Sequence, residues 1–419
     1  MKTKWMCMIP VVALALNLSA CGNGQEYRNS SENGTMEMET QSQEDCASEN
    51  TGNKSNNINM IDLQDNDTDK MIVEVGTVKD SAFSGKVSGC YYADGSRMIV
   101  EADKLYLYDT GKGETITSAD ISMEELCVQT YADGYFIVGQ ENGGGNDSSM
   151  VSQSDVGING YILNKNFEIK NVISFNGLLS DDFILQPTGV AISQDGKQIA
   201  FGGFKGLYLY DTSSQKVRMI LNYSENGRAD NMEIATMESI TFTGDNTLVY
   251  VGTAIDASNG GDGFSVHGTI STDGTNLTIT KKADYQVDTG EIQKGGELLI
   301  MPQSFNTNNG TLLMLDTVSN TERMMSFSSR SEGKDGVFCS AQGKYVATSV
   351  LGENSVTVNI YDTVSGKNIH KETVRNSNNT YFLRIPQILI LDESGTCIVV
   401  LGRGIGEVST LITTFGFEG

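Results

Sequence analysis

The stretch Lys104-Leu-Tyr-Leu-Tyr-Asp-Thr110 decides the fold, because close copies of it recur along the chain at Leu207–Thr212, Leu312–Thr317 and Val358–Thr363. Each copy is a short run of apolar and aromatic residues that ends in Asp-Thr, which is the pattern of a strand followed by a turn. A short polar side chain at the end of a strand can hydrogen-bond to the backbone of the next turn. We therefore predict that the repeated aspartate has a structural role.

Tight turns between strands provide a second marker with the same period. They fall at Asp94-Gly95, Asp133-Gly134, Asp195-Gly196, Asp245-Asn246, Gly295-Gly296, Gln342-Gly343 and Ser394-Gly395. Such dipeptides supply the positive φ that hairpins need. Their second residues are 39 to 62 residues apart, with a mean of 50. Four strands in about 50 residues form one blade of a β-propeller. The prediction is an all-β fold with seven blades, with six or eight as alternatives.

The seventh unit has three evident strands, at Gln387–Leu391, Thr396–Leu401 and Val408–Thr413. A lone apolar run, Lys70–Val75, precedes the first unit and could supply the missing fourth strand. Pairing of this kind would close the ring and cover sheet edges that otherwise promote aggregation.

The turn Ser193-Gln-Asp-Gly-Lys197, taken with the Leu-Tyr-Leu-Tyr-Asp-Thr runs, resembles the WD-like and YVTN-type propellers of bacterial surface proteins. The resemblance covers residues 71–419 and rests on structural turns. It implies the propeller fold and leaves the function open, since propellers have many unrelated activities. Tyr-Asp stands where eukaryotic WD repeats have Trp-Asp.

The first 21 residues resemble a bacterial lipoprotein signal. Lys2 and Lys4 form a basic start, Met6–Leu18 is mostly apolar, and Leu18-Ser-Ala-Cys21 matches the lipobox. The apolar run is too short for a stable transmembrane helix. The resemblance implies that residues 1–20 are removed and that Cys21 carries lipid, which would hold the chain on the extracytoplasmic face of a membrane.

Residues 21–70 are predicted to be a disordered acidic linker behind Cys21. The segment from residue 22 to residue 70 has 11 acidic and 3 basic residues and few large apolar ones. Such a composition cannot bury enough apolar surface to offset the ordering entropy. The whole chain has a formal charge of −24, and such an acidic surface repels nucleic acid, so we expect no nucleic-acid partner. The domains are thus 1–20, 21–70 and the propeller at 71–419.

Two long insertions are candidate binding loops, because function in repeat folds concentrates in such segments. The first contains Glu141, Asn146 and Asp147, and the second contains Asp256, Asn259 and Asp262. Their oxygen atoms make Ca²⁺ a possible ligand, although the spacing fits no known calcium loop. We expect no other cofactor, and the absence of Cys-x-x-Cys indicates neither a zinc ribbon nor a thioredoxin-like site. Cys90, Cys127, Cys339 and Cys397 are expected to be small, buried, unpaired residues.

The sequence contains no catalytic motif that would identify an enzyme. The two histidines, His267 and His370, lie outside any His-Glu-x-x-His run, and no Gly-x-Ser-x-Gly elbow is present. We therefore predict an interaction module at the cell envelope that binds a protein, peptide or other ligand through its rim or channel. The alternative is a propeller hydrolase that acts on a small lactone or a glycan.

Overall fold

The computed structural model divides the chain into two units, Met1–Ser55 and Asn56–Gly419. The first unit lies outside the described residues. In the second, the structure describes residues 59–62 and 88–417, except for 142–156, 180, 185, 245, 259–262, 282–285, 288–291, 304–310, 328–335, 353–354, 376–386, 392–393 and 403–409. No helix within these described parts is long and apolar enough to cross a membrane.

The strands form seven sheets, which we number as blades 1 to 7 in chain order. Blade 1 is β2(Gly89–Asp94), β3(Arg97–Glu101), β4(Leu105–Asp109) and β5(Glu114–Ala119). Blade 2 is β6(Met123–Tyr131), β7(Gly134–Glu141), β8(Ile158–Asn164) and β9(Ile169–Ser174). Blade 3 is β10(Val190–Ile192), β11(Gln198–Gly202), β12(Gly206–Asp211) and β13(Lys216–Asn222). Blade 4 is β14(Arg228–Ala229), β15(Met232–Thr243), β16(Thr247–Asp256), β17(Phe264–Ser271) and β18(Thr280–Lys281).

The remaining blades complete the ring. Blade 5 is β19(Gln293–Gly295), β20(Leu298–Pro302), β21(Thr311–Asp316) and β22(Thr321–Ser326), and β1(Asn59–Asp62) pairs with β22 in parallel as a fifth strand. Blade 6 is β23(Val337–Cys339), β24(Tyr345–Leu351), β25(Ser355–Asp362) and β26(Asn368–Arg375). Blade 7 is β27(Gln387–Leu391), β28(Thr396–Gly402) and β29(Thr410–Gly416). Three short helices, η2(Asn176–Leu178), η3(Pro187–Gly189) and α1(Tyr223–Asn226), lie in connections between blades 2, 3 and 4.

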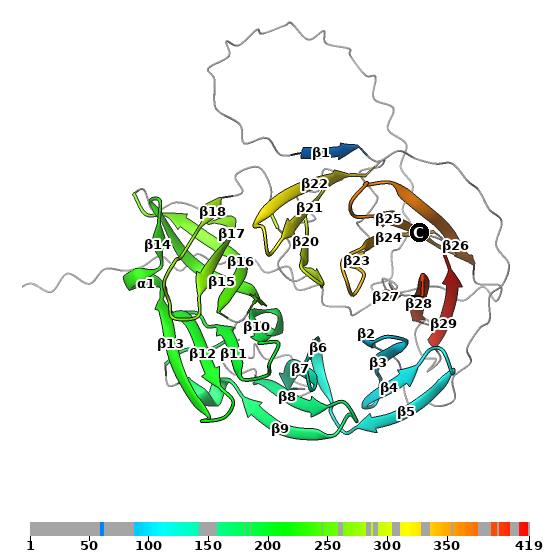
Figure 1. The fold of residues 1–419 in the computed structure, drawn as a ribbon, viewed down its shortest axis with the longest axis horizontal. Coiled ribbons are helices and arrows are strands. Elements are labelled where there is room, and N and C mark those ends of the chain that lie inside the picture. Colours follow the sequence, from blue (N-terminus) through cyan, green and yellow to red (C-terminus); the bar gives the residue numbers. More distant parts are fainter. Residues whose placement is uncertain are drawn as a thin grey trace, which may run out of the picture. The chain divides into compact units, whose positions relative to one another are not determined.

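Figure 1 shows the seven blades around a common centre, so the predicted seven-bladed all-β propeller is confirmed. Apart from β1, each strand pairs antiparallel with its neighbours in the sheet. When β15 to β18 are counted as the first to fourth strands of blade 4, with the two-residue β14 as an extra strand, turns between the first and second strands of a blade therefore lie on the same face as turns between its third and fourth strands. We call this the turn face, and the opposite face carries the connections between second and third strands.

The repeated Asp-Thr pair fastens these turns, as predicted for the aspartate. Asp211 Oδ1 accepts hydrogen bonds from the backbone N–H groups of Ser213 and Ser214 at 3.1 and 2.7 Å. The hydroxyl of Thr212 donates to the carbonyl of Gly196 at 2.9 Å and so joins the two turns of blade 3. The same two roles recur at Asp109-Thr110, Asp316-Thr317 and Asp362-Thr363.

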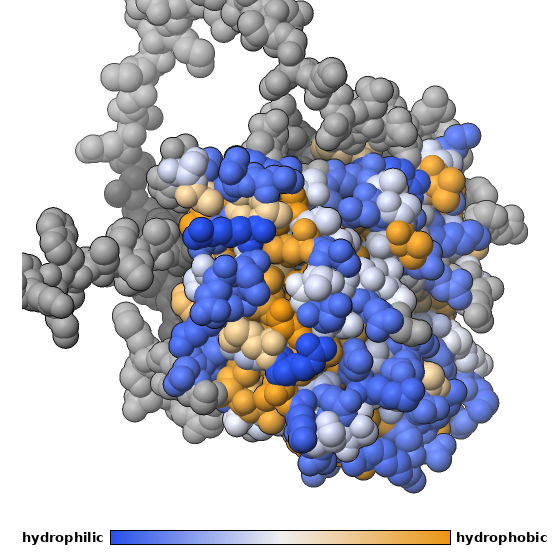
Figure 2. All heavy atoms as spheres, turned by 60° about the vertical axis from the view of Figure 1, so that its left-hand side comes forward, coloured by the Kyte–Doolittle hydropathy of each residue, from blue (hydrophilic) through white to orange (hydrophobic). Residues whose placement is uncertain are grey.

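The hydrophobic core lies between blades, and each of its seven clusters is shared by two neighbouring blades. One cluster joins the last blade to the first, with Tyr106 and Tyr108 of blade 1 packed near Leu391 and Ile398 of blade 7. Because burial of apolar surface is the main stabilising term, contacts between blades hold the ring together. The outer surface is more mixed. Figure 2 shows an irregular hydrophobic band among hydrophilic side chains on the side that carries blades 3 and 4.

Two glutamine side chains also connect inner strands of neighbouring blades, and we call them amide clips. Gln129 on β6 donates to the Val190 carbonyl at 2.6 Å and accepts from the Ile192 N–H at 3.1 Å. Gln387 on β27 accepts from the Cys90 N–H at 2.6 Å and donates to the Ser88 carbonyl at 3.3 Å. The second clip spans the junction of blades 7 and 1.

The structure corrects some of the predicted turns and part of the predicted linker, and other predictions concern residues outside the described parts of the chain. Between β15 and β16, Gly244 has a φ of 66°, one position before the predicted Asp245-Asn246 turn, of which Asp245 lies outside the described residues. Gly134 of the predicted blade 2 turn instead begins β7. Strand β1 lies within the segment predicted to be a disordered linker. The predicted closing strand Lys70–Val75 and the lipidation site Cys21 lie outside the described residues. Cys90, Cys127, Cys339 and Cys397 are free thiols.

Candidate functional site

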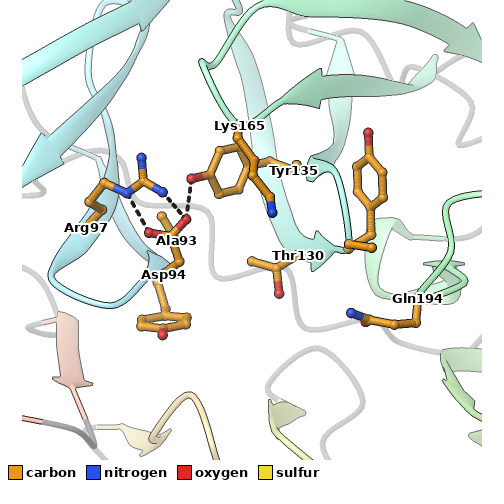
Figure 3. A pocket seen from close by; sticks show the side chains of 11 residues that line it. Ala93, Asp94, Arg97, Thr130, Tyr135, Lys165 and Gln194 are labelled. Atoms are coloured by element: carbon orange, nitrogen blue, oxygen red, sulfur yellow. Dashed lines mark hydrogen bonds and ion pairs between the residues drawn. The ribbon is translucent and has the colours of Figure 1, made fainter.

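A pocket of about 440 Å³ opens on the turn face between blades 1, 2 and 3 (Figure 3). Its wall comes from the first turns of these three blades and from the turn between β8 and β9. We call it the turn pocket, and it is lined by Tyr92, Ala93, Asp94, Arg97, Thr130, Tyr131, Ala132, Gly134, Tyr135, Lys165 and Gln194.

One wall of the turn pocket is a fixed group of three side chains. Arg97 Nε donates to Asp94 Oδ1 at 2.5 Å, and Arg97 Nη2 bonds to Asp94 Oδ2. The buried Tyr135 hydroxyl donates to the same Asp94 Oδ2 at 2.7 Å, so blades 1 and 2 are joined at this point (Figure 3). The hydrogen bond to Asp94 raises the pKa of Arg97. Burial is the main cause that raises the pKa of Tyr135, and its hydrogen bond to Asp94 adds to this effect. Arg97 therefore neutralises Asp94 through a forked contact.

The aromatic side of the pocket is supported by a glycine. Gly196, in the first turn of blade 3, has φ of 70°. A Cβ atom added there would lie 2.8 Å from Cε2 of the Tyr131 ring. Only glycine suits both the backbone conformation and this close approach. Burial, with a smaller contribution from Asp133, raises the pKa of Tyr131, so its hydroxyl is neutral at physiological pH.

The turn between β8 and β9 departs from the repeat. Asn164-Lys165 stands where four other blades have Asp-Thr. Asn164 Oδ1 still accepts from the backbone N–H groups of Asn166 and Glu168, at 3.1 and 2.9 Å. Lys165 occupies the threonine position and, in the view of Figure 3, extends between Tyr135 and Thr130.

Three polar side chains of the pocket can bind a ligand. Within the described parts of the chain, the Lys165 amine, the Thr130 hydroxyl and the Gln194 side-chain amide have no hydrogen-bond or ion-pair partner. All three are exposed, and Tyr92 and Tyr131 are half-buried beside them. The set offers one positive charge, hydrogen-bond donors and aromatic surface, which suits recognition of a polar or anionic group.

The predicted binding loops belong to the opposite face of the ring. Glu141 is the last residue of β7 and Asp256 is the last residue of β16, so both insertions leave from ends of second strands. Asp256 Oδ1 accepts from the N–H and hydroxyl of Ser258, at 2.8 and 2.6 Å. Asn146, Asp147, Asn259 and Asp262 lie outside the described residues, so their binding role stays a prediction. The described residues contain no group of three or more His, Cys, Asp or Glu side chains placed to hold a metal ion.

The turn pocket was not identified from the sequence. Tyr135 is buried, and it lines the pocket together with the half-buried Tyr92 and Tyr131. A usable signal was present in the sequence: the second unit has Asn164-Lys165 where the motif requires Asp-Thr.

Comparison with known proteins supports the fold and goes no further. No protein-family model and no curated protein matches the chain. The β-propeller domain of Myceliophteria thermophila Cps50 (Swd1) matches with a TM-score of 0.50 and 10% identity, over 81% of this chain and 98% of that one. The complex of KlAtg21 with the coiled-coil of AgAtg16 matches with a TM-score of 0.45 and 12% identity, over 80% and 100%. The chain therefore has a WD40-like seven-bladed β-propeller fold.

Proposed function

We propose that the chain is an interaction module that binds a protein or peptide partner through the turn pocket. The supporting observation is the change in blade 2, where Asn164-Lys165 replaces the pair that fastens the turns of four other blades. The pocket lies at this turn, with a lysine extending over it and tyrosines beside it. Tyrosine and cationic side chains beside a recess are typical of protein-binding surfaces.

The proposal includes a location. A chain cleaved before Cys21 and lipidated there would be held at the extracytoplasmic face of a membrane, with residues 21–70 as a linker to the propeller. This part rests on the sequence of the first 21 residues. It would present the ring to other proteins of the cell envelope.

Site-specific photo-crosslinking in intact cells tests the binding surface. A photoreactive phenylalanine analogue is placed at Tyr131 in the pocket, or at Ile116, which is 45% exposed on the outer strand β5 and serves as the control. We expect a covalent polypeptide adduct from position 131 and none from position 116. Equal adducts from both positions, or none from position 131, would contradict the proposed binding surface.

A further inference from the structure

We infer that the turn pocket binds a carboxylate of its partner, either an acidic side chain or a C-terminal carboxylate, with Lys165 as the charge partner. The inference rests on the proposed function, because it names the chemical group that the pocket would recognise. The argument for a carboxylate comes from the turn between β8 and β9, where Asn164 keeps the backbone hydrogen bonds of the repeated aspartate and Lys165 replaces the repeated threonine.

The turn of blade 2 keeps the hydrogen bonds of the repeat with an amide in place of the aspartate, and its one carboxylate, Glu168, is held by Asn164 Nδ2 at 2.8 Å and by the Lys170 amine at 2.7 Å. Asn164 Oδ1 bonds to two backbone N–H groups two and four positions ahead, much as Asp109 Oδ1 bonds to those of Gly111 and Lys112 at 3.0 and 3.1 Å. In blade 1, the carboxylate of Asp109 also lies 3.5 Å from the Lys112 amine. Asparagine can fix the turn equally well, but it leaves a neighbouring lysine without this carboxylate.

Lys165 also does not make the hydrogen bond between turns that the threonine of the motif makes in other blades. In blades 1 and 3, the threonine hydroxyl donates to a carbonyl of the first turn, at 2.7 and 2.9 Å. Lys165 takes that position in blade 2 and has no partner among the described residues. Lys112 and Lys197, in nearby turns, and Lys170, on β9, are each paired with an aspartate or glutamate.

The side chains that line the pocket carry a net positive charge, since Asp94 is the one acidic group among them beside Arg97 and Lys165; the Asp133 carboxylate, which acts on Tyr131, lies outside this lining. Asp94 is the carboxylate on its wall, and Arg97 neutralises it through two contacts. Lys165 adds a positive charge with no counter-charge among the described residues. Thr130 and Gln194 offer neutral donors that could bond to the same ligand oxygen atoms.

The same arrangement favours a carboxylate over a phosphate group. Proteins that recognise phosphorylated peptides usually present arginine forks or clusters. The fork of Arg97 is already engaged by Asp94, so the available cation is one lysine. Tyr92 and Tyr131 provide flat surfaces along which the rest of a peptide can pack.

Short peptides of defined charge test the inference. The probes are acetyl-Gly-Glu-Gly-amide, its Gln counterpart, and acetyl-Gly-Gly-Gly with a free C-terminal carboxylate. Each is titrated against the purified full chain in neutral detergent, with binding followed by saturation-transfer difference NMR. At least one carboxylate probe should bind roughly tenfold more tightly than the Gln probe, since one charge-assisted hydrogen bond is worth about that factor. The tighter of the two carboxylate probes distinguishes a side chain from a chain end.

Two variants and one control assign the effect to this turn. Lys165→Gln removes the charge, and Asn164→Asp restores the carboxylate of the repeat beside it. Both should abolish the preference for the carboxylate. Lys367→Gln makes the same charge change at an exposed turn of blade 6 and should keep it. Because the Lys165 side chain is exposed, we expect Lys165→Gln to fold normally, which urea unfolding checks.

The outcomes separate this inference from the proposed function. If the wild-type chain shows no preference for a carboxylate, or the preference survives both variants, the inference is overturned. A polypeptide adduct at Tyr131 that persists unchanged in Lys165→Gln would leave the interaction module standing and remove the carboxylate chemistry. A carboxylate preference without any adduct at Tyr131 would overturn the protein partner instead.

Discussion

Replacing Gln387 by methionine should weaken the junction between blades 7 and 1. Methionine has nearly the same length as glutamine, so the change removes the amide clip and largely preserves the packing. Two hydrogen bonds are lost, from the Cys90 N–H at 2.6 Å and to the Ser88 carbonyl at 3.3 Å.

The size of the effect follows from where these two groups lie. Cys90 is partly buried on the inner strand β2, and a donor left without an acceptor in such a place costs roughly 1–3 kcal/mol. Ser88 is exposed, so its carbonyl can bond to water at little cost. We expect Gln387→Met to lower the free energy of unfolding by about 2 kcal/mol. Gln129→Met should cost more, about 3 kcal/mol, because both of its partners, on Val190 and Ile192, belong to buried residues.

Urea unfolding followed by far-UV circular dichroism measures both variants, since Trp5 is the only tryptophan of the chain and is a poor reporter on the ring. Gln215→Met, at an exposed turn residue, is the matched control. Hydrogen exchange at the Cys90 amide should also become faster in Gln387→Met. A midpoint for Gln387→Met equal to that of the control, with unchanged slope, would refute the role of the clip in closing the ring.

Three further predictions concern single positions. Gly196→Ala should lower the free energy of unfolding by about 1–2 kcal/mol, because alanine disfavours the positive φ and its Cβ would clash with Tyr131. The same variant should reduce the photo-crosslinked adduct at position 131. Unchanged stability would contradict the close approach of Gly196 to Tyr131. Hydrogen bonds from the Lys197 backbone, the Lys197 amine and the Ser193 hydroxyl lower the pKa of Asp195 from 3.8 to about 2, so its contribution to stability is present above pH 3.8 and is lost as the pH falls toward 2. The free energy of unfolding of Asp195→Asn should therefore fall less than that of the wild type between pH 4 and pH 2, and parallel curves would contradict this. Cys21→Ser should move the protein from the membrane fraction to the soluble fraction while its unfolding curve stays the same; a variant that stays in the membrane pellet would refute the lipid anchor.

The features that could be predicted are those encoded by residues close together in the sequence. Asp211 bonds to the backbone two and three positions ahead, so the motif reveals both the turn and the strand before it. The predicted strand Gln387–Leu391 is the same in the structure for this reason, with β-branched and apolar residues next to a Ser-Gly turn. These local signals repeat in almost every blade and fix the fold class.

The turn pocket could not be derived in the same way, because its walls come from separate blades. Arg97, Tyr131 and Gln194 are brought together by the packing of blades 1, 2 and 3, which no local pattern reports. Lys165, the cation of the pocket, lies in the one turn of this kind where Asn-Lys replaces the Asp-Thr of blades 1, 3, 5 and 6. The predicted loops were chosen for length and polarity, and their strand ends Glu141 and Asp256 lie on the face opposite the pocket.

The sharing of every core cluster between two blades has a consequence for how the protein is made. No blade has a core of its own, so the inner side chains of blade 1, such as Met98 and Val100, lack cover until Leu389 and Ile398 of blade 7 have been synthesised. The ring is therefore completed only when β27 to β29 of blade 7 have left the ribosome. Until then, the growing chain exposes the apolar side chains of blade 1 that blade 7 covers in the finished ring.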